Sequence, residues 1–240
     1  NAGPGKRAWR TPIPRFAPVG PQGLAGAFRF HTADFSSLAH AVLFSLSPPA
    51  AFRQLFPRLV VGRWKKPTML DRVKVIQGDI TKQAVDAIVN AANTTLLGGG
   101  GVDGAIHREA GPHLVWECRK LGGCPTGGAR ITKGYYLPAK HVIHAVGPIW
   151  QGGDCGEEDL LARAYRSVFE LVEQHAITSV ALPSISTGAY RFPLDRATRI
   201  AVRESRACLE RNFSLKLIAF ICFEKPAYDA YVAAVAETFG

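Results

Sequence analysis

Strand-like and helix-like patterns alternate along the chain after Met69, and this alternation constrains the fold more than any other feature. Short apolar segments predict strands, and longer segments with apolar residues at helical spacing predict helices. The predicted strands are 73–77, 87–89, 129–135, 141–146, 180–183 and 215–223. The predicted helices are 102–121, interrupted at Gly111-Pro112, then 157–175, 194–209 and 227–238. Such alternation predicts an α/β fold whose sheet is covered by helices on both faces.

Positive charge is concentrated in the first 68 residues. This segment holds ten Lys or Arg and a single acid, Asp34, and so carries +9 of the formal net charge of +10. It also holds nine of the sixteen prolines, and none of its apolar runs approaches the ~20 residues of a membrane span. We therefore divide the chain into a basic, Pro-rich leader, residues 1–68, and a folded domain, residues 69–240.

Three interpretations of the leader stay open. Met69 is the only methionine and stands directly before the first strand pattern, which favours a native start at Met69 and a leader that is not native. The second interpretation is a genuine disordered or targeting extension, although the match to a mitochondrial transit peptide is poor. The third is a small accessory structure. No function is assigned to the leader.

A run of four glycines, 98–101, precedes the first predicted helix. Each glycine raises the entropic cost of ordering the backbone, so the run indicates a need for close approach. A glycine loop that enters a helix presents free backbone N–H groups and the positive helix end, which together suit a phosphate. Residues 99–104 also fit G-x-G-x-x-G, but the loop begins too far after Val89 and the acid Glu117 falls inside a helix, which disfavours a Rossmann site. A P-loop is excluded because no Gly-Lys-Ser/Thr follows.

Two further segments follow predicted strands. The loop 183–190 combines hydroxyl residues with a glycine; alone it fits an ordinary turn, but with the glycine loop it would clamp a diphosphate from both sides. Asp79 ends the first strand and fits either a helix N-cap or a carboxylate that accepts a hydrogen bond from an amine such as that of adenine. Ligands of open α/β sheets bind beyond the carboxyl ends of the strands, so these segments are candidates for one site.

In this order the segments resemble the macrodomain family, and specifically its MacroD-type branch. The matching segments are GDIT (78–81), VDAIVNAAN (85–93), LLGGGGVDGAIH (96–107), VIHAVGP (142–148) and SISTG (184–188). The resemblance covers residues 70–239 and none of the leader. It implies a three-layer α/β/α macrodomain fold with a central mixed sheet and a cleft that binds ADP-ribose.

The resemblance also implies which residues bind the ligand. Asp79 would hold the adenine amine with Ile80 beside it, and Phe223 is a candidate for stacking on adenine. The glycine loop and the second loop would hold the diphosphate from opposite sides. The other expected ligand-binding residues are Asn90, Ala91, Gly100, Gly101, Val102, Ser186, Thr187, Gly188, Ala189 and Tyr190.

Three residues are the catalytic candidates: Asn93, Asp103 and His107. The resemblance implies that Asn93 and Asp103 face the distal ribose. His107 lies four residues after Asp103, hence on the same helix face, and we favour an orienting or packing role for it over that of a base. A water held by Asp103 would hydrolyse an ester between ADP-ribose and a protein Asp or Glu, or O-acetyl-ADP-ribose. Whether Asp103 or the ligand's diphosphate acts as the base stays open.

The main alternative is a reader that binds ADP-ribose or its polymer without turnover; the presence of both Asn93 and Asp103 favours the hydrolase. The expected partners are ADP-ribose, ADP-ribosylated proteins and O-acetyl-ADP-ribose, with the physiological acceptor and the oligomeric state left open. No cofactor and no membrane are expected, and nucleic acid is expected only through the basic leader.

The remaining polar and aromatic residues predict no further site. No zinc-type spacing or CxxC pair is present, so no metal is expected. The cysteines at 118, 124, 155, 208 and 222 fit buried reduced thiols of a cytoplasmic protein. His144 is interpreted as a satisfied core histidine, and Tyr135, Tyr136 and Trp150 as core or rim residues.

Overall fold

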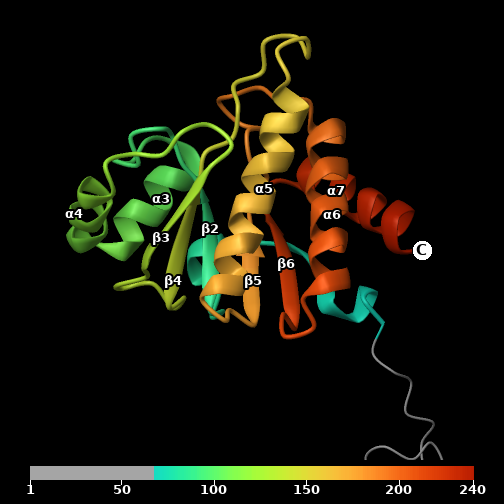
Figure 1. Ribbon diagram of the computed structural model, residues 1–240, viewed down its shortest axis with the longest axis horizontal. Helices are drawn as coiled ribbons and strands as arrows, with labels where there is room; N and C mark the ends of the chain where they lie inside the picture. Colours follow the sequence, from blue (N-terminus) through green and yellow to red (C-terminus); the bar gives the residue numbers. More distant parts are fainter. Residues whose placement is uncertain (1–67) are drawn as a thin grey trace, which may run out of the picture. The chain divides into compact units, whose positions relative to one another are not determined.

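The computed structural model describes residues 68–240, which lie within the second of two units of the chain, Lys65–Gly240. The interpretations of the leader concern residues that lie outside the described ones, except for Thr68. A central sheet is sandwiched between two layers of helices (Figure 1). Within residues 68–240, no helix is long and apolar enough to cross a membrane.

The sheet has six strands, five of which run in one direction. They are β1 (Val73–Gln77), β2 (Ala87–Ala91), β3 (Ala129–Lys133), β4 (His141–Ala145), β5 (Ser179–Leu182) and β6 (Leu217–Cys222). Their order is β1-β6-β5-β2-β4-β3, and only β3 is antiparallel to its neighbour, β4. The predicted mixed sheet is confirmed, and the parallel strands all end at one edge.

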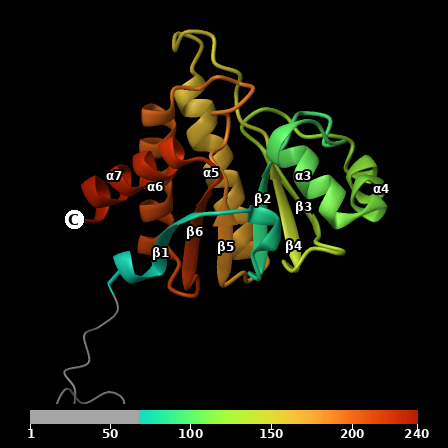
Figure 2. The same cartoon turned by 180° about the vertical axis from the view of Figure 1, so that it is seen from behind.

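Helices cover both faces of the sheet (Figures 1 and 2). They are α3 (Gly101–Ala110), α4 (Pro112–Leu121), α5 (Glu157–Gln174), α6 (Leu194–Arg211) and α7 (Lys225–Phe239), with short 3-10 turns η1 (Leu70–Arg72) and η2 (Ile80–Lys82). One buried cluster joins α5, α6 and α7 to the sheet, and it includes Phe169 and Tyr231. A second cluster joins α3 and α4 to the opposite face through Ile106 and Leu114. The three-layer α/β/α prediction is confirmed.

The sequence patterns predict each of these strands and α helices, and the differences lie at the ends. The predicted break is confirmed, because α3 ends before Gly111, whose φ of 79° interrupts the helix. Strand β2 runs two residues further than predicted and includes the polar Asn90, whose side chain bonds to the buried Asp103 and His144. Strand β3 stops two residues earlier, and Tyr135 beyond it adopts φ 53°, which an extended strand cannot continue through.

Candidate functional site

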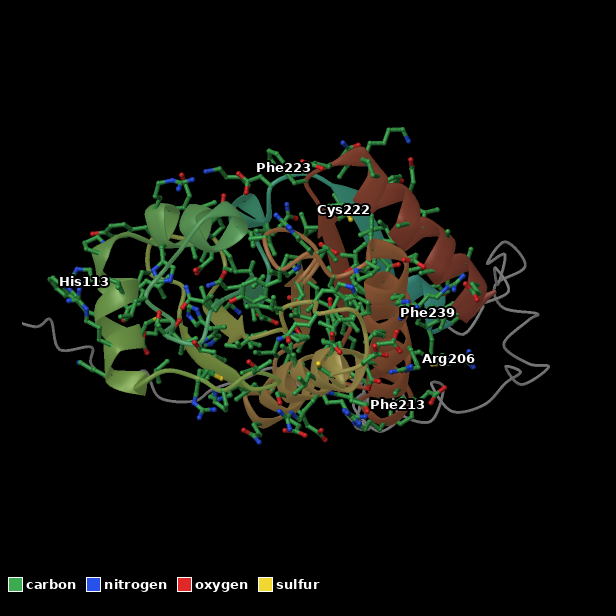
Figure 3. All side chains as sticks on the ribbon, turned by 90° about the horizontal axis from the view of Figure 1, so that it is seen from above. His113, Arg206, Phe213, Cys222, Phe223 and Phe239 are labelled. Atoms are coloured by element: carbon green, nitrogen blue, oxygen red, sulfur yellow. The ribbon has the colours of Figure 1, made fainter. Side chains whose placement is uncertain are left out.

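The candidate site lies along the edge where the parallel strands end, and Figure 3 looks down on this edge. Asp79 follows β1 and Phe223 follows β6. The loop 183–190 follows β5, and the loop containing Asn93 follows β2. Strands β1 and β2 are three strand spacings apart, or about 14 Å at ~4.8 Å each. The four segments therefore form a line suited to an extended ligand with two different ends.

The glycine loop leads directly into α3. Gly98 has φ 92°, a left-handed conformation that favours glycine. Gly104 packs so closely that an added Cβ would lie 2.5 Å from the carbonyl oxygen of Gly99, whereas Gly100 and Gly101 face open space. The N-cap of α3 is Gly100, which has no side chain to satisfy the first N–H groups of the helix. These donors and the positive helix end form a binding position for an anion.

Asp103, in the first turn of α3, is the buried carboxylate of the site. It is only 4% exposed, and its Oδ1 accepts a 2.7 Å hydrogen bond from Nδ2 of Asn90. Its Oδ2 points toward the glycine loop, 3.0 Å from the position that a Cβ on Gly99 would occupy. Burial raises the pKa of Asp103, and the hydrogen bond from Asn90 and the nearby His107 only partly oppose this.

Asn90 is fully buried and its side chain faces interior partners, so direct ligand binding by Asn90 stays a prediction. It lies opposite His144 in the β2–β4 register, and its Nδ2 is 3.1 Å from Nδ1 of that ring. Because an amide nitrogen only donates, Nδ1 of His144 accepts and Nε2 carries the proton, 3.0 Å from Oγ1 of Thr132. Asn90 thus supports Asp103 from behind. The interpretation of His144 as a satisfied core histidine is confirmed, and burial lowers its pKa to about 3.

His107 covers Asp103 from the next turn of α3. Its Nε2 lies 3.4 Å from Asp103 Oδ1, but the two are not aligned as a hydrogen bond. An added Cβ on Gly98 would lie 3.5 Å from the ring. Burial lowers the pKa of His107, which favours a neutral imidazole. This placement is compatible with the packing or orienting role that we predict for it.

The structure brings together three potential metal ligands that sequence spacing did not reveal. Donor atoms of His107, Cys118 and His144 all lie within 4.8 Å of one another. Both nitrogens of His144 already have partners outside the cluster, in Asn90 and Thr132, and Nε2 is also 3.6 Å from Sγ of Cys118. Burial raises the pKa of Cys118 to about 12, which disfavours the thiolate that binds metals. We interpret the cluster as part of the core beneath Asp103.

Asn93 is primarily a scaffold of the glycine loop. Its Nδ2 donates to the carbonyl oxygen of Gly98 at 2.8 Å, and its Oδ1 accepts from N and Oγ1 of Thr95 and from N of Leu96. The amide of Asn93 therefore makes most of its hydrogen bonds within the loop. These internal bonds are not part of the predicted role of Asn93, which is a contact to the ribose. Its Nδ2 nevertheless lies 3.4 Å from the Cβ position of Gly99, on the side that Asp103 Oδ2 faces.

The second loop is held in place by its neighbours. Ser186 is buried with φ 67°, and Phe192 donates its backbone N–H to the carbonyl of Ser186 at 3.0 Å. A side chain on Gly147 would collide with Ser186, so the loops after β4 and β5 touch. In this loop Gly188 and Ala189 are exposed, and Thr187 and Tyr190 are half-buried. Two other predicted ligand-binding residues, Ala91 and Val102, lie across the sheet edge and are also half-buried. The buried contacts of Ser186 thus hold the loop in place, and the backbone around Gly188 is left open to solvent.

Asp79 is the N-cap of η2, so the capping interpretation is confirmed. Its Oδ1 accepts from N and Oγ1 of Thr81, both at 2.8 Å, while the residue as a whole stays exposed. Ile80 is buried. Phe223, labelled beside Cys222 in Figure 3, is 82% exposed. The backbone N–H of Gly78 donates to the carbonyl oxygen of Cys222 and joins the two strand ends. An exposed carboxylate and an exposed aromatic ring therefore lie at adjacent strand ends.

Sequence analysis missed Glu157, which holds the loop between β4 and α5. Its carboxylate accepts backbone N–H groups from Gln151 and Gly153 at 3.0 Å and from Cys155 at 2.7 Å. Burial opposes its ionisation, but the backbone N–H of Glu157 itself and these three donors prevail and lower the pKa of Glu157 to about 2. The same loop bonds to the second loop, from Trp150 N to the carbonyl of Tyr190.

The remaining aromatic and cysteine residues can also be placed. Of the two predicted alternatives, core or rim, the core is excluded for Tyr135 and Tyr136, which are 37% and 72% exposed because they follow the early end of β3. Trp150 fits the prediction, packing edge-on against Phe192. The prediction of buried thiols fails at Cys155, which is exposed in the loop before α5, whereas the other four free cysteines are buried.

Comparisons with known proteins agree with this geometry. The macro domain family model matches residues 89–201. A macro domain-containing protein of Mesorhizobium japonicum is 57% identical over 167 residues, 70% of this chain and 95% of that protein. A Pantoea vagans protein named O-acetyl-ADP-ribose deacetylase 1 is 50% identical over 167 residues, 68% of this chain and 98% of that protein. The Trypanosoma brucei macrodomain in complex with ADP-ribose superposes with a TM-score of 0.66 and 37% identity, covering 85% of this chain and 92% of the other. The chain therefore belongs to the macrodomain family.

Proposed function

We propose that this protein binds ADP-ribose and hydrolyses its esters, namely mono-ADP-ribosyl-Asp or -Glu on proteins and O-acetyl-ADP-ribose. The observation that carries the proposal is the placement of Asp103. Its carboxylate is buried, held from behind by Asn90 and directed at the glycine loop at the start of a helix. A carboxylate with a raised pKa is a stronger base than an exposed one, which suits proton abstraction from water.

The ligand would lie along the line of loops at the sheet edge. Adenine would occupy the β1–β6 end, between Asp79 and Phe223. The diphosphate would bind the uncapped N–H groups of α3 on one side and the loop 186–190 on the other. The distal ribose would then reach Gly99, beside Asn93 and Asp103.

Hydrolysis needs one water and no redox step. The water oxygen forms a bond to the ester carbonyl carbon, and the bond from that carbon to the ribose oxygen breaks. The proton lost by water passes to Asp103 or to the ligand's diphosphate, and the ribose oxygen gains a proton as it leaves. The products are ADP-ribose and the free carboxylic acid, so positioning the water and stabilising developing charge are the tasks of the site.

Two relatives support the two parts of the proposal. The Trypanosoma brucei macrodomain was solved with ADP-ribose, which supports binding. The Pantoea vagans relative is named as a deacetylase of O-acetyl-ADP-ribose, which supports ester hydrolysis. Binding without turnover is the second candidate function. It is favoured by one observation, the engagement of Asn93 in loop hydrogen bonds, which gives that residue a structural task.

The test is incubation of the protein with a glutamate-ADP-ribosylated protein and with O-acetyl-ADP-ribose, with release of ADP-ribose followed over time. Affinity for free ADP-ribose is measured in parallel by calorimetry. We expect turnover of at least one ester together with specific binding. Tight binding without release from either substrate would contradict hydrolysis and establish a reader, and absence of binding would reject both functions.

A further inference from the structure

We propose that a hollow beside the glycine loop binds the acidic protein segment that flanks the modified Asp or Glu. This inference rests on the proposed function, because it assigns the acceptor side of the same substrate. The hollow has a volume of about 400 Å³. It is lined by Thr94, Thr95, Leu97, Arg119, Gly122 and Gly123.

The hollow adjoins the proposed reaction centre. Thr95, in its wall, donates from N and Oγ1 to Oδ1 of Asn93 at 3.0 and 2.6 Å. Nδ2 of Asn93 and Oδ2 of Asp103 then flank the same position above Gly99, at 3.4 and 3.0 Å. The side chain of Asn93 therefore contacts the wall of the hollow and also faces the position that the Asp103 carboxylate faces.

The direction of the substrate leads to the same place. The nucleotide end would lie over β1 and β6, and the distal ribose over the end of β2. The acceptor attached to that ribose continues away from the nucleotide, beyond β2, where the sheet order places β4 and β3 and where α4 packs. The hollow lies there, between residues 94–97 and the end of α4.

The backbone gives the hollow a defined shape. The backbone N–H of Cys124 donates to the carbonyl oxygen of Thr94 at 2.9 Å, which ties its two walls together. Gly122 closes α4 in a left-handed conformation with φ 69°. Gly123 has φ 88°, and an added Cβ would lie 2.7 Å from the carbonyl oxygen of Thr94. Its two walls are therefore joined before any partner binds.

The lining suits a carboxylate on an aliphatic stem. Arg119 is exposed, and none of the ion pairs among residues 68–240 includes it. A guanidinium presents paired donors that match a carboxylate. Leu97, 47% exposed, offers an apolar surface, and Thr94 offers a hydroxyl group, whereas the hydroxyl of Thr95 already donates to Asn93. A nucleic acid would require several basic groups and aromatic faces, neither of which lines this hollow.

The experiment compares two peptides that carry ADP-ribosyl-glutamate, one with acidic and one with neutral flanking residues, alongside O-acetyl-ADP-ribose. We expect the wild type to prefer the acidic peptide. Arg119→Ala should lower kcat/KM for that peptide about tenfold, the scale of a lost hydrogen bond to a charged group, and leave the acetyl ester unaffected. Arg119→Lys should retain part of the preference, because it keeps the charge without the paired donors. Lys120→Ala, at the adjacent exposed position, is the matched control and should change nothing.

The same peptides attached to ADP-ribose through a linkage that is not an ester separate this inference from the proposed function. Calorimetry on them measures the preference even if no ester is turned over, and Arg119→Ala should abolish it. Equal affinity of the wild type for both peptides would overturn the inference, as would an equal loss on all substrates in Arg119→Ala. An oligonucleotide that carries ADP-ribose on its terminal phosphate is measured in the same way. If Arg119→Ala loses affinity for this oligonucleotide alone, the hollow binds nucleic acid and the inference is overturned.

Discussion

Two buried carboxylates near helix starts differ in the hydrogen-bond donors that surround them, and their pKa values shift in opposite directions. Asp103, at the start of α3, and Glu157, at the start of α5, are 4% and 2% exposed. Burial raises the pKa of Asp103, which has a single side-chain donor in Asn90, whereas three backbone N–H groups of the preceding loop help to lower the pKa of Glu157 to about 2.

The difference shows that burial alone does not set the pKa of a carboxylate. Each backbone N–H that binds the ionised form stabilises it, so Glu157 is fixed as an anion and is a poor base. Asp103 keeps one oxygen directed at the glycine loop and a raised affinity for a proton. The first arrangement orders a loop, and the second suits chemistry.

The strongest way to test this contrast is Asp103→Ala. We expect turnover of an ADP-ribosyl-glutamate substrate to fall by about 10²-fold or more, within the range that general base catalysis supplies. Affinity for free ADP-ribose should change much less. Single-turnover release and calorimetry give the two quantities.

Asn93→Ala and the double variant serve as controls for that result. Asn93→Ala should also slow turnover, and the double variant should lose less than the product of the single losses, because both residues act on one step. Full activity in Asp103→Ala would contradict the role of Asp103 as the base and favour attack assisted by the diphosphate of the substrate.

A third carboxylate, the exposed Asp79, sharpens the comparison because its predicted role is recognition alone. We expect Asp79→Ala to weaken ADP-ribose binding by roughly 1 to 3 kcal/mol, the scale of a lost hydrogen bond that involves a charge. Calorimetry measures this. Since the variant also loses the cap of η2, circular dichroism must first show that it is folded. Unchanged affinity in a folded variant would leave Asp79 with capping as its role.

Glu157→Gln tests the structural side of the contrast and should lower Tm by several degrees at neutral pH. The folded pKa of Glu157 is depressed to about 2 from an ordinary 4.5, so its stabilisation is present above about 4.5 and is lost as the pH falls toward 2. The Tm difference between wild type and variant should therefore shrink across this window. A difference that is constant with pH would show that the carboxylate charge is not what holds the loop.

The smallest effect is expected from removing residues 1–68. The segment differs from the rest of the chain in composition, since it holds nine of the sixteen prolines and a single acid, and the strand and helix pattern begins after Met69. A protein that begins at Met69 should keep its thermal stability and its ADP-ribose affinity. Loss of soluble folding on truncation would assign the leader a structural role.

Local pattern was enough to predict the elements of the fold and the loops of the candidate site. Apolar spacing predicts the helices, and Gly111-Pro112 predicts the break between α3 and α4. The glycine run predicts close approach of a ligand to the backbone; Gly100 and Gly101 face open space, which leaves room for one, and the approach itself stays a prediction. These features depend on neighbours in the sequence, which is why the sequence reveals them.

What the sequence did not reveal depends on contacts between distant segments. The sequence does not reveal the partners of Asn90, although the alternation of β2 puts Asn90 on the same face as the buried Ile88 and so indicates its burial. The approach of Cys118 to His144 depends on how α4 packs against the sheet, and no spacing predicts it. The donors around Glu157 come from a loop conformation that glycine-rich sequence leaves undetermined.

The strand order has a consequence for the sequence of events in folding. Strand β1 has β6 as its only sheet neighbour among the described residues, and the two are separated by most of the domain. As the chain leaves the ribosome, the segment at Val73–Gln77 must wait for Leu217–Cys222 before it can pair. The central strands β5, β2 and β4 are complete earlier. The Asp79 end of the site would therefore form last, and a nascent chain would acquire the surroundings of Asp103 before it could hold a nucleotide.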